Sequence, residues 1–255
     1  MRDFVHHFVE LLLAMTEKEL RARYKHTLFG FFWLVANPLL QMLVIGFVFR
    51  FFMKSEIPLY NYYLFLGLLV WNFFSSSLSK TTPSIVYERN LIKKAKFSHA
   101  VIPLSIILSN FIHLLSALIL FIVPVLILKT YSFTSLPVLL LASVLLLLFT
   151  CGLSLFTSAL NVRFRDISFF VQAVLIIWFY ATPILYTFSF IPYEYIWLWR
   201  LNPMVSIIQL FQNGLLNFPM PGPAMLATNS FSIIGILIVG IVTFKRESKH
   251  FDDWL

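Results

Sequence analysis

Charged residues are scarce in this sequence, and cysteine is almost absent. Only 12% of the 255 residues are charged, whereas 60% are hydrophobic and the mean hydropathy is +0.87. A soluble domain of this size carries about 25% charged residues, so the composition predicts an integral membrane protein. The single cysteine, Cys151, lies inside an apolar run and excludes an intrachain disulfide. The net charge of +8 comes from short basic clusters between apolar runs, which favours cytoplasmic loops over a nucleic-acid-binding face.

The sequence also lacks the motifs of an autonomous enzyme or pump. None of its eight glycines precedes a lysine, so it has no phosphate-binding loop, and neither HExxH nor a paired Cys/His spacing indicates a metal site. No Asp, Glu, Lys or Arg lies in the central part of a predicted span, which argues against coupling to an ion gradient. His113 is the titratable exception, and beside Asn110 it is more typical of an interhelical hydrogen-bond partner. We therefore predict no catalytic residue, and energy supplied by a partner on the cytoplasmic side.

The segment from Thr16 to Leu40 joins a charged helix directly to an apolar one. Upstream, Phe4, Phe8 and Leu12 recur at helical spacing, which predicts an amphipathic interface helix over residues 1–26. It would lie on the cytoplasmic membrane surface, either as a passive anchor or with a functional role. We do not expect a signal peptide, because the first apolar run begins near residue 27 and is too long.

Apolar windows without charges predict six transmembrane helices within a single transmembrane domain, residues 1–255. The expected spans are about 28–52, 58–79, 99–127, 136–161, 167–187 and 226–244. Fifteen of the 19 basic residues then lie on the side of the N-terminus and four on the other side, so we expect both termini in the cytoplasm.

One further helix is predicted before the last span. Asn202 and Pro203 form an N-cap followed by proline at the first helical position, and the Pro-rich stretch 217–223 ends the helix. The enclosed segment 203–216 is too short to cross a bilayer. We therefore expect a re-entrant or surface helix there, and an all-α fold throughout.

The cytoplasmic loop after the second span, residues 83–97, is the expected docking site for a partner. It mixes apolar and charged side chains more than a simple chain reversal requires, although a basic surface helix that binds anionic lipid explains the pattern equally well. The residues expected to meet the partner are Tyr87, Glu88, Arg89, Asn90, Leu91, Lys93 and Lys94.

Aromatic residues are concentrated in two segments that are predicted to lie at the extracytoplasmic surface of the membrane. Interfacial aromatic belts explain such residues routinely, but their density also allows stacking against sugar rings along a translocation path. The candidate glycan-contacting residues are Tyr60, Tyr63, Tyr180, Tyr186, Trp197 and Trp199.

Several motifs resemble the membrane subunits of type-2 ABC exporters for polysaccharides, most closely the O-antigen export permeases of the Wzm type. These motifs are ELRARYKHTLFGFFW at 19–33, NPL at 37–39, WNFF at 71–74, NLIKK at 90–94, NVRFRDI at 161–167, TPILY at 182–186 and LNPM at 201–204. They cover nearly the whole chain. Ser98 departs from the family, which often has proline there.

The resemblance implies a homodimer that works with two ATP-binding-cassette subunits in the bacterial inner membrane. ATP and Mg would bind to those partner chains, with no cofactor in this one. It further implies a cytoplasmic gate helix around 1–26, a coupling helix within 84–96 and short re-entrant helices within 188–217. The substrate would be a glycan linked to undecaprenyl diphosphate, and basic residues suit its phosphates. The gate-helix residues assigned to the diphosphate are Arg21, Arg23, Tyr24 and Lys25.

Two kinds of alternative remain open from the sequence. The same architecture could export teichoic acid, capsule, a drug or a small lipid. A membrane scaffold for glycan assembly, with no transport role, is a different class of function. That scaffold would form no stable complex with an ATPase.

Overall fold

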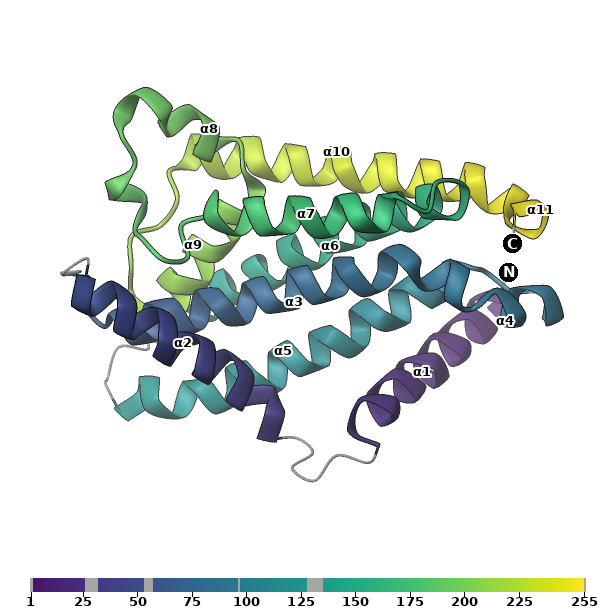
Figure 1. Cartoon of the computed structure of the whole chain (residues 1–255), viewed down its shortest axis with the longest axis horizontal. Coiled ribbons are helices and arrows are strands. Elements are labelled where there is room, and N and C mark those ends of the chain that lie inside the picture. The colour runs from purple at the N-terminus through teal and green to yellow at the C-terminus, as the bar shows by residue number, and fades with distance from the viewer. Residues whose placement is uncertain (1, 26–31, 53–56, 96, 128–134, 255) are drawn as a thin grey trace.

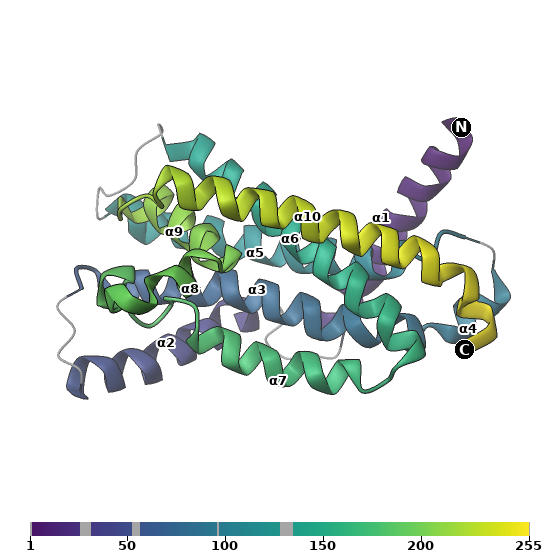
Figure 2. The same ribbon diagram turned by 90° about the horizontal axis from the view of Figure 1, so that it is seen from above.

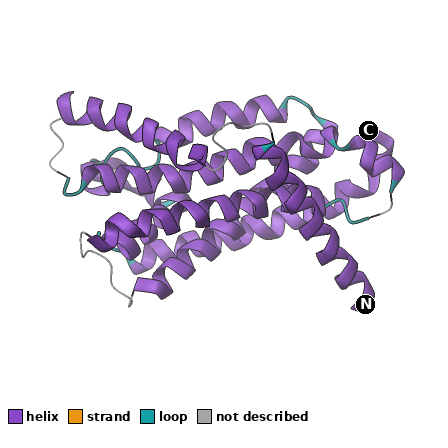
Figure 3. Ribbon diagram, turned by 90° about the horizontal axis from the view of Figure 1, so that it is seen from below, coloured by secondary structure: helices purple, strands orange, loops and turns teal. Residues whose placement is uncertain are grey.

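The structure, a computed structural model, describes residues 2–25, 32–52, 57–95, 97–127 and 135–254 (Figure 1). Within these ranges all regular structure is helical, which confirms the predicted all-α fold (Figure 3). The α-helices are α1 (Arg2–Tyr24), α2 (Trp33–Phe52), α3 (Tyr60–Tyr87), α4 (Arg89–Lys94), α5 (Val101–Ile127), α6 (Leu136–Arg163), α7 (Ile167–Tyr180), α8 (Ile196–Arg200), α9 (Pro203–Leu216), α10 (Pro223–Glu247) and α11 (Phe251–Trp254). Short 3-10 turns cover Phe188–Phe190, Tyr193–Tyr195 and Ser248–His250.

The helices form an elongated bundle whose two ends differ. The helices α2, α3, α5, α6, α7 and α10 run along its length in alternating directions (Figures 1 and 2). Both chain termini, α4 and α11 lie at one end, whereas α8 and α9 lie at the other (Figure 1). The amino-terminal part of α1 projects away from the bundle at the end that holds the termini (Figure 2).

Apolar composition and length make three helices of the described chain suitable for crossing a membrane: Val101–Ile127, Leu136–Arg163 and Pro223–His250. Two shorter apolar stretches, Ala36–Phe49 and Ile167–Tyr180, accompany them. The long helix α3 carries a run of serines, threonines and Lys80 in its second half, which lowers its hydropathy.

The helix α3 forms the centre of the bundle. It packs against α2, α5, α6, α7 and α9, and most of its residues are buried. Its Phe74 ring stacks on Phe149 of α6 at 5.4 Å between centroids and meets Trp178 of α7 edge-on at 5.3 Å. Aromatic pairs in these geometries contribute beyond the area that they bury, so α3, α6 and α7 are fixed together at this level.

The helices α6 and α10 cross at two glycines. A Cβ atom on Gly152 would lie 2.7 Å from the Leu237 Cα, and one on Gly240 would lie 2.1 Å from the Gly152 carbonyl oxygen. Small residues allow helix backbones to approach this closely in membrane bundles. The α6–α10 crossing therefore depends on the absence of side chains at both positions.

Helix boundaries differ from the predicted spans at several ends, including those of α3, α7 and α10. The helix α3 continues through Pro83 to Tyr87, and the Thr81 and Thr82 hydroxyls donate to the Ser77 and Leu78 carbonyls in the turn before the proline. Helix α7 ends at Tyr180 instead of near 187, since Pro183 disfavours helical conformation just before it. Helix α10 begins at Pro223, directly after Gly222, and thus slightly before the expected residue 226.

The short helix α9 has the predicted bounds, Pro203–Leu216. Asn202 caps it by accepting a hydrogen bond from the Met204 amide at 3.1 Å, and Asn217 ends it in a left-handed conformation. The Asn202 side chain also accepts from Trp178 Nε1 at 2.9 Å and donates to Thr182 Oγ1 at 3.1 Å. One amide thus joins the start of α9 to the end of α7.

Candidate functional site

The end of the bundle that holds the termini is built on a separate apolar cluster. Ile85 of α3, Ile92 of α4 and Phe251 of α11 are almost completely buried in this cluster. Met15 of α1 joins them, with Phe8, Leu11 and Leu12 packed against its edge. The apolar face of the predicted amphipathic helix, with Phe8 and Leu12, is therefore the face that contacts the bundle at this end.

Helix α4 is anchored by one face and exposes the other. Ile92 is buried, and Leu91, one of the predicted partner-facing residues, is half-buried. The Tyr87 side chain is 78% exposed. Arg89, Asn90, Lys93 and Lys94 are exposed as well.

Glu88 links this segment to the N-terminal helix. The Lys18 ammonium donates to Glu88 Oε1 at 2.7 Å, across 70 residues of sequence. The sequence placed Glu88 among the partner-facing residues, but in the structure its side chain also pairs with α1. It joins α1 to the junction of α3 and α4.

The basic residues of α1 separate into two groups in the structure. Arg21 pairs with Glu17 on the same exposed helix face, and Lys25 is exposed. Arg23 instead donates to the Asn110 side chain of α5, and Asn110 in turn donates to Ser77 Oγ of α3 at 3.0 Å. The Tyr24 side chain lies outside the described part of the structure. Of the assigned cations, Arg23 is thus the one that reaches into the bundle.

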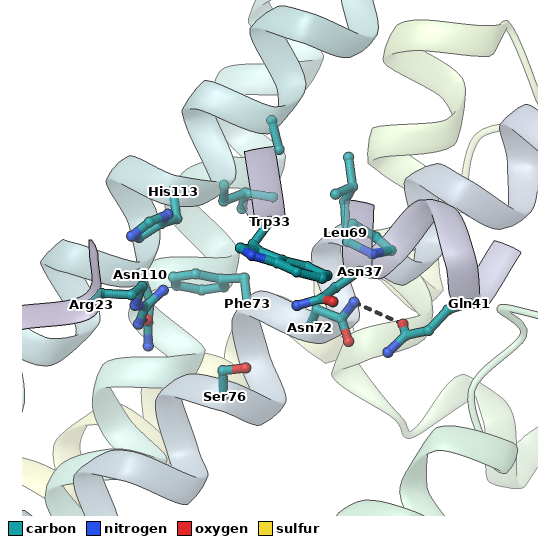
Figure 4. A pocket seen from close by; sticks show the side chains of 13 residues that line it. Arg23, Trp33, Asn37, Gln41, Leu69, Asn72, Phe73, Ser76, Asn110 and His113 are labelled. Carbon is teal, nitrogen blue, oxygen red and sulfur yellow. Dashed lines mark hydrogen bonds between the residues drawn. The ribbon is translucent and has the colours of Figure 1, made fainter. Parts of the chain in front are cut away.

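A cavity of about 450 Å³ opens beside Arg23, between α1, α2, α3 and α5 (Figure 4). Arg23, Asn110 and His113 group at one end, and the amides of Asn37, Asn72 and Gln41 at the other (Figure 4). Trp33 and Phe73 lie between the two groups, and Ser76 also lines the space. Asn72 Nδ2 donates to Gln41 Oε1 at 3.0 Å and joins α3 to α2. None of these amides is among the site residues predicted from the sequence.

A second hollow of about 540 Å³ is a groove lined by residues of α2, α3 and α7. Gln41 and Asn72 line this groove too, so the pair lies where the two spaces meet. Ser75, Ser79 and Gln172 add polar groups along it. Tyr180, one of the predicted glycan-contacting residues, lines it at the end of α7 and is 63% exposed.

Most of the other predicted aromatics brace the end of the bundle opposite the termini. The buried Tyr60 donates to the Leu185 carbonyl at 3.0 Å, and the buried Tyr63 lies 3.0 and 2.9 Å from the Pro183 and Tyr186 carbonyl oxygens. Both hydroxyls hold the turn that follows α7, so neither ring presents an open face for a sugar.

The remaining predicted aromatics are only partly free of internal contacts. Tyr186 donates to the Tyr180 carbonyl at 2.8 Å, and Trp199 Nε1 donates to Tyr186 Oη at 3.0 Å. Trp197 is 57% exposed. Tyr180 and Trp197 are thus the members of the predicted set that combine a large ring with substantial exposure.

One signal in the sequence could have found the amides of the cavity. Gln41 and Asn72 lie inside apolar windows, and polar groups in spans are costly unless they face protein, water or a ligand. Their meeting place could not have been found, because it depends on how α2, α3 and α5 pack. Within the described residues, no cluster of His, Cys, Asp or Glu has the makings of a metal site.

The structure thus has the features of a multi-pass membrane protein, with exposed side chains on α4 at one end and polar spaces between its helices. A family model described as ABC-2 type transporter matches residues 10–216. This chain therefore belongs to the ABC-2 type transporter family.

Curated relatives resemble the chain over almost its full length. An O-antigen export system permease protein RfbA from Klebsiella pneumoniae is 32% identical, with 92% of this chain and 93% of the relative covered. The RfbA protein of Myxococcus xanthus is 34% identical, with 94% of each chain covered. The polysialic acid transport protein KpsM of Escherichia coli is 21% identical over 92% of this chain and 93% of its own length.

Proposed function

We propose that this chain is the transmembrane subunit of an exporter that moves a lipid-linked, O-antigen-like polysaccharide across the bacterial inner membrane. Two copies would work with two ATPase subunits, which bind ATP and Mg and hydrolyse the nucleotide. The observation that carries the proposal is similarity over nearly the whole chain to O-antigen export permeases. KpsM, named for polysialic acid transport, favours a polysaccharide over a drug or small lipid within this family.

The proposed topology has six spans, formed by α2, α3, α5, α6, α7 and α10. Both termini lie at the same end of the bundle, as an even number of crossings requires (Figure 1). Fifteen of the 19 basic residues then belong to the cytoplasmic side, which agrees with the positive-inside rule. In this arrangement α9 is a re-entrant helix on the outer side, too short to cross.

The ATPase would dock on the exposed face of Tyr87–Lys94. Its side chains project from a short helix whose inner face is fixed by Ile92 in the apolar cluster. Because α4 directly follows α3 in the chain, a movement of α4 by the ATPase would be transmitted to α3. The Lys18–Glu88 pair extends the connection to α1, the proposed gate helix.

The groove on α2, α3 and α7 supports the homodimer. Amides such as Gln41 and Gln172 would be costly against lipid acyl chains. A second copy packed over this face would enclose the polar residues in a channel between the two subunits, with Tyr180 at the end of α7. The exposed Trp197 would lie near the exit.

The docking proposal is tested by replacing Tyr87 and Arg89 together with alanine and measuring co-purification with the ATPase subunit. We expect at least about a tenfold loss of complex, because truncated aromatic and arginine anchors at interfaces cost the most. The matched control is Lys245→Ala, an exposed basic residue at the same end of the bundle. Unchanged complex formation would remove this surface from the mechanism.

Transport itself is tested in proteoliposomes that contain the permease with its ATPase. We expect ATP-dependent movement of lipid-linked glycan into the lumen of inverted vesicles, and none with the permease by itself. A stable permease that binds no ATPase would instead support the scaffold alternative.

A further inference from the structure

Several polar side chains line the cavity between α1, α2, α3 and α5. Asn37, Gln41 and Ser76 are exposed and Asn72 is half-buried, although all lie on helices proposed to span the membrane. Polar side chains in such helices mark substrate paths or water-filled spaces because contact with lipid is unfavourable. The cavity is thus a candidate binding site in its own right.

The two ends of this cavity differ in chemistry. Arg23 provides a permanent positive charge at one end, and the other end carries neutral amides (Figure 4). None of the described residues that line the cavity is an Asp or Glu, so the lining adds no negative charge of its own. The arrangement suits a ligand that is anionic at one end and neutral and polar at the other.

Each end of the cavity suits one chemical group: phosphate at the Arg23 end and sugar hydroxyls at the amide end. The guanidinium group is the side chain best suited to phosphate oxygens. The amides of Asn37, Gln41 and Asn72 offer both donors and acceptors, as sugar hydroxyls require. Trp33 lies between the two ends and presents an aromatic surface beside the amides (Figure 4). The volume of about 450 Å³ is that of a small-ligand pocket, too small for a long glycan.

We propose that this cavity binds the junction of the lipid-linked substrate, with Arg23 on the diphosphate and the amides of Asn37, Gln41 and Asn72 on the first sugar. This inference rests on the proposed function, since it assumes a substrate with a lipid diphosphate. The Gln41–Asn72 pair also borders the groove on α2, α3 and α7. A sugar held by that pair therefore directs the following residues of the glycan toward the groove.

The test measures binding to the permease–ATPase complex in nanodiscs of zwitterionic lipid. The two probes are undecaprenyl diphosphate and undecaprenyl diphosphate that carries one N-acetylglucosamine. The wild-type complex should prefer the sugar-bearing probe. In the double variant Gln41→Ala/Asn72→Ala, affinity for that probe should fall about tenfold, to the level of the bare diphosphate, because about two hydrogen bonds are lost.

Arg23→Gln is the complementary variant. It keeps an amide donor for Asn110 and removes the charge, so affinity for both probes should fall about tenfold while the preference for the sugar remains. Asn61→Ala is the matched control: Asn61 is an exposed amide at the other end of α3 and should leave both affinities unchanged. Elution with the ATPase on size exclusion checks that each variant is folded.

The possible failures are distinguishable. If the wild-type complex binds neither probe, the proposed function is wrong and the inference falls with it. If it binds both probes but the double variant keeps the preference for the sugar, only the assignment of the cavity is wrong. Displacement of both probes by phosphatidylglycerol, without any preference for the sugar, would show an ordinary anionic-lipid site and overturn the inference.

Discussion

The two sides of the bundle are held together in different ways. On the side of α6, α9 and α10, backbones approach without intervening side chains at Gly152 and Gly240, and the buried Asn229 donates to Ser206 Oγ at 2.6 Å. On the side of α1 and α2, the helices border two polar spaces, and amide side chains such as Gln41 and Asn72 join α2 to α3. We expect the first side to carry the stability of the fold and the second to carry function.

The largest effect on stability is expected at the α6–α10 crossing. Gly240→Leu would force a side chain into the Gly152 carbonyl, from which even a Cβ atom would be only 2.1 Å away. Because the obstacle is backbone, the helices must separate, and we expect a loss of more than about 3 kcal/mol or failure to fold. Thermal unfolding in detergent measures this loss.

Gly235→Ala is the control on the same helix. A Cβ atom at Gly235 would meet nothing within 4 Å, so the variant should be neutral or slightly stabilising, as alanine favours helix. Equal melting temperatures for Gly240→Leu and the wild type would show that α6 and α10 can separate without cost, and the comparison between the two sides would fail.

A smaller loss is expected at Asn202, where α9 begins. Asn202→Ala removes the cap on the Met204 amide and leaves Trp178 Nε1 without its acceptor, so we expect a loss of about 2 kcal/mol. Asn202→Ser keeps a capping oxygen but is too short for the bonds to α7, and it should lie between alanine and the wild type. A serine variant as unstable as the alanine variant would show that the cap contributes little.

Asn202 shows which features could be predicted from the sequence and which could not. Local chemistry predicted the cap and both ends of α9, because Asn202, Pro203 and the Pro-rich stretch act through neighbouring backbone. The bonds from Asn202 to Trp178 and Thr182 depend on how α7 packs against α9, and no spacing along the chain encodes them. Short-range signals were therefore sufficient for elements and insufficient for their contacts.

The same division explains the mixed outcome for the candidate site. Tyr63 and Tyr180 belong to equally aromatic stretches, yet Tyr63 is 3% exposed and bonds to carbonyls, whereas Tyr180 lines a groove. Arg21 and Arg23 lie two residues apart on one helix, which turns them to different faces. Composition indicated these segments, and only the packing of the helices separates bracing residues from those that could bind a substrate.

The smallest effect on stability, and the sharpest test of the comparison, is expected at Lys18 and Glu88. Both side chains are partly exposed, at 55% and 29%, so Lys18→Glu should change the free energy of unfolding by less than about 1 kcal/mol, as for other surface ion pairs. Glycan-stimulated ATPase activity should nevertheless fall severalfold, because repulsion would separate α1 from the segment that the ATPase moves. The exchanged variant, Lys18→Glu with Glu88→Lys, should restore the stimulation if the pair acts by attraction. A melting temperature that falls as far as in Asn202→Ala would instead assign α1 to the rigid side of the bundle.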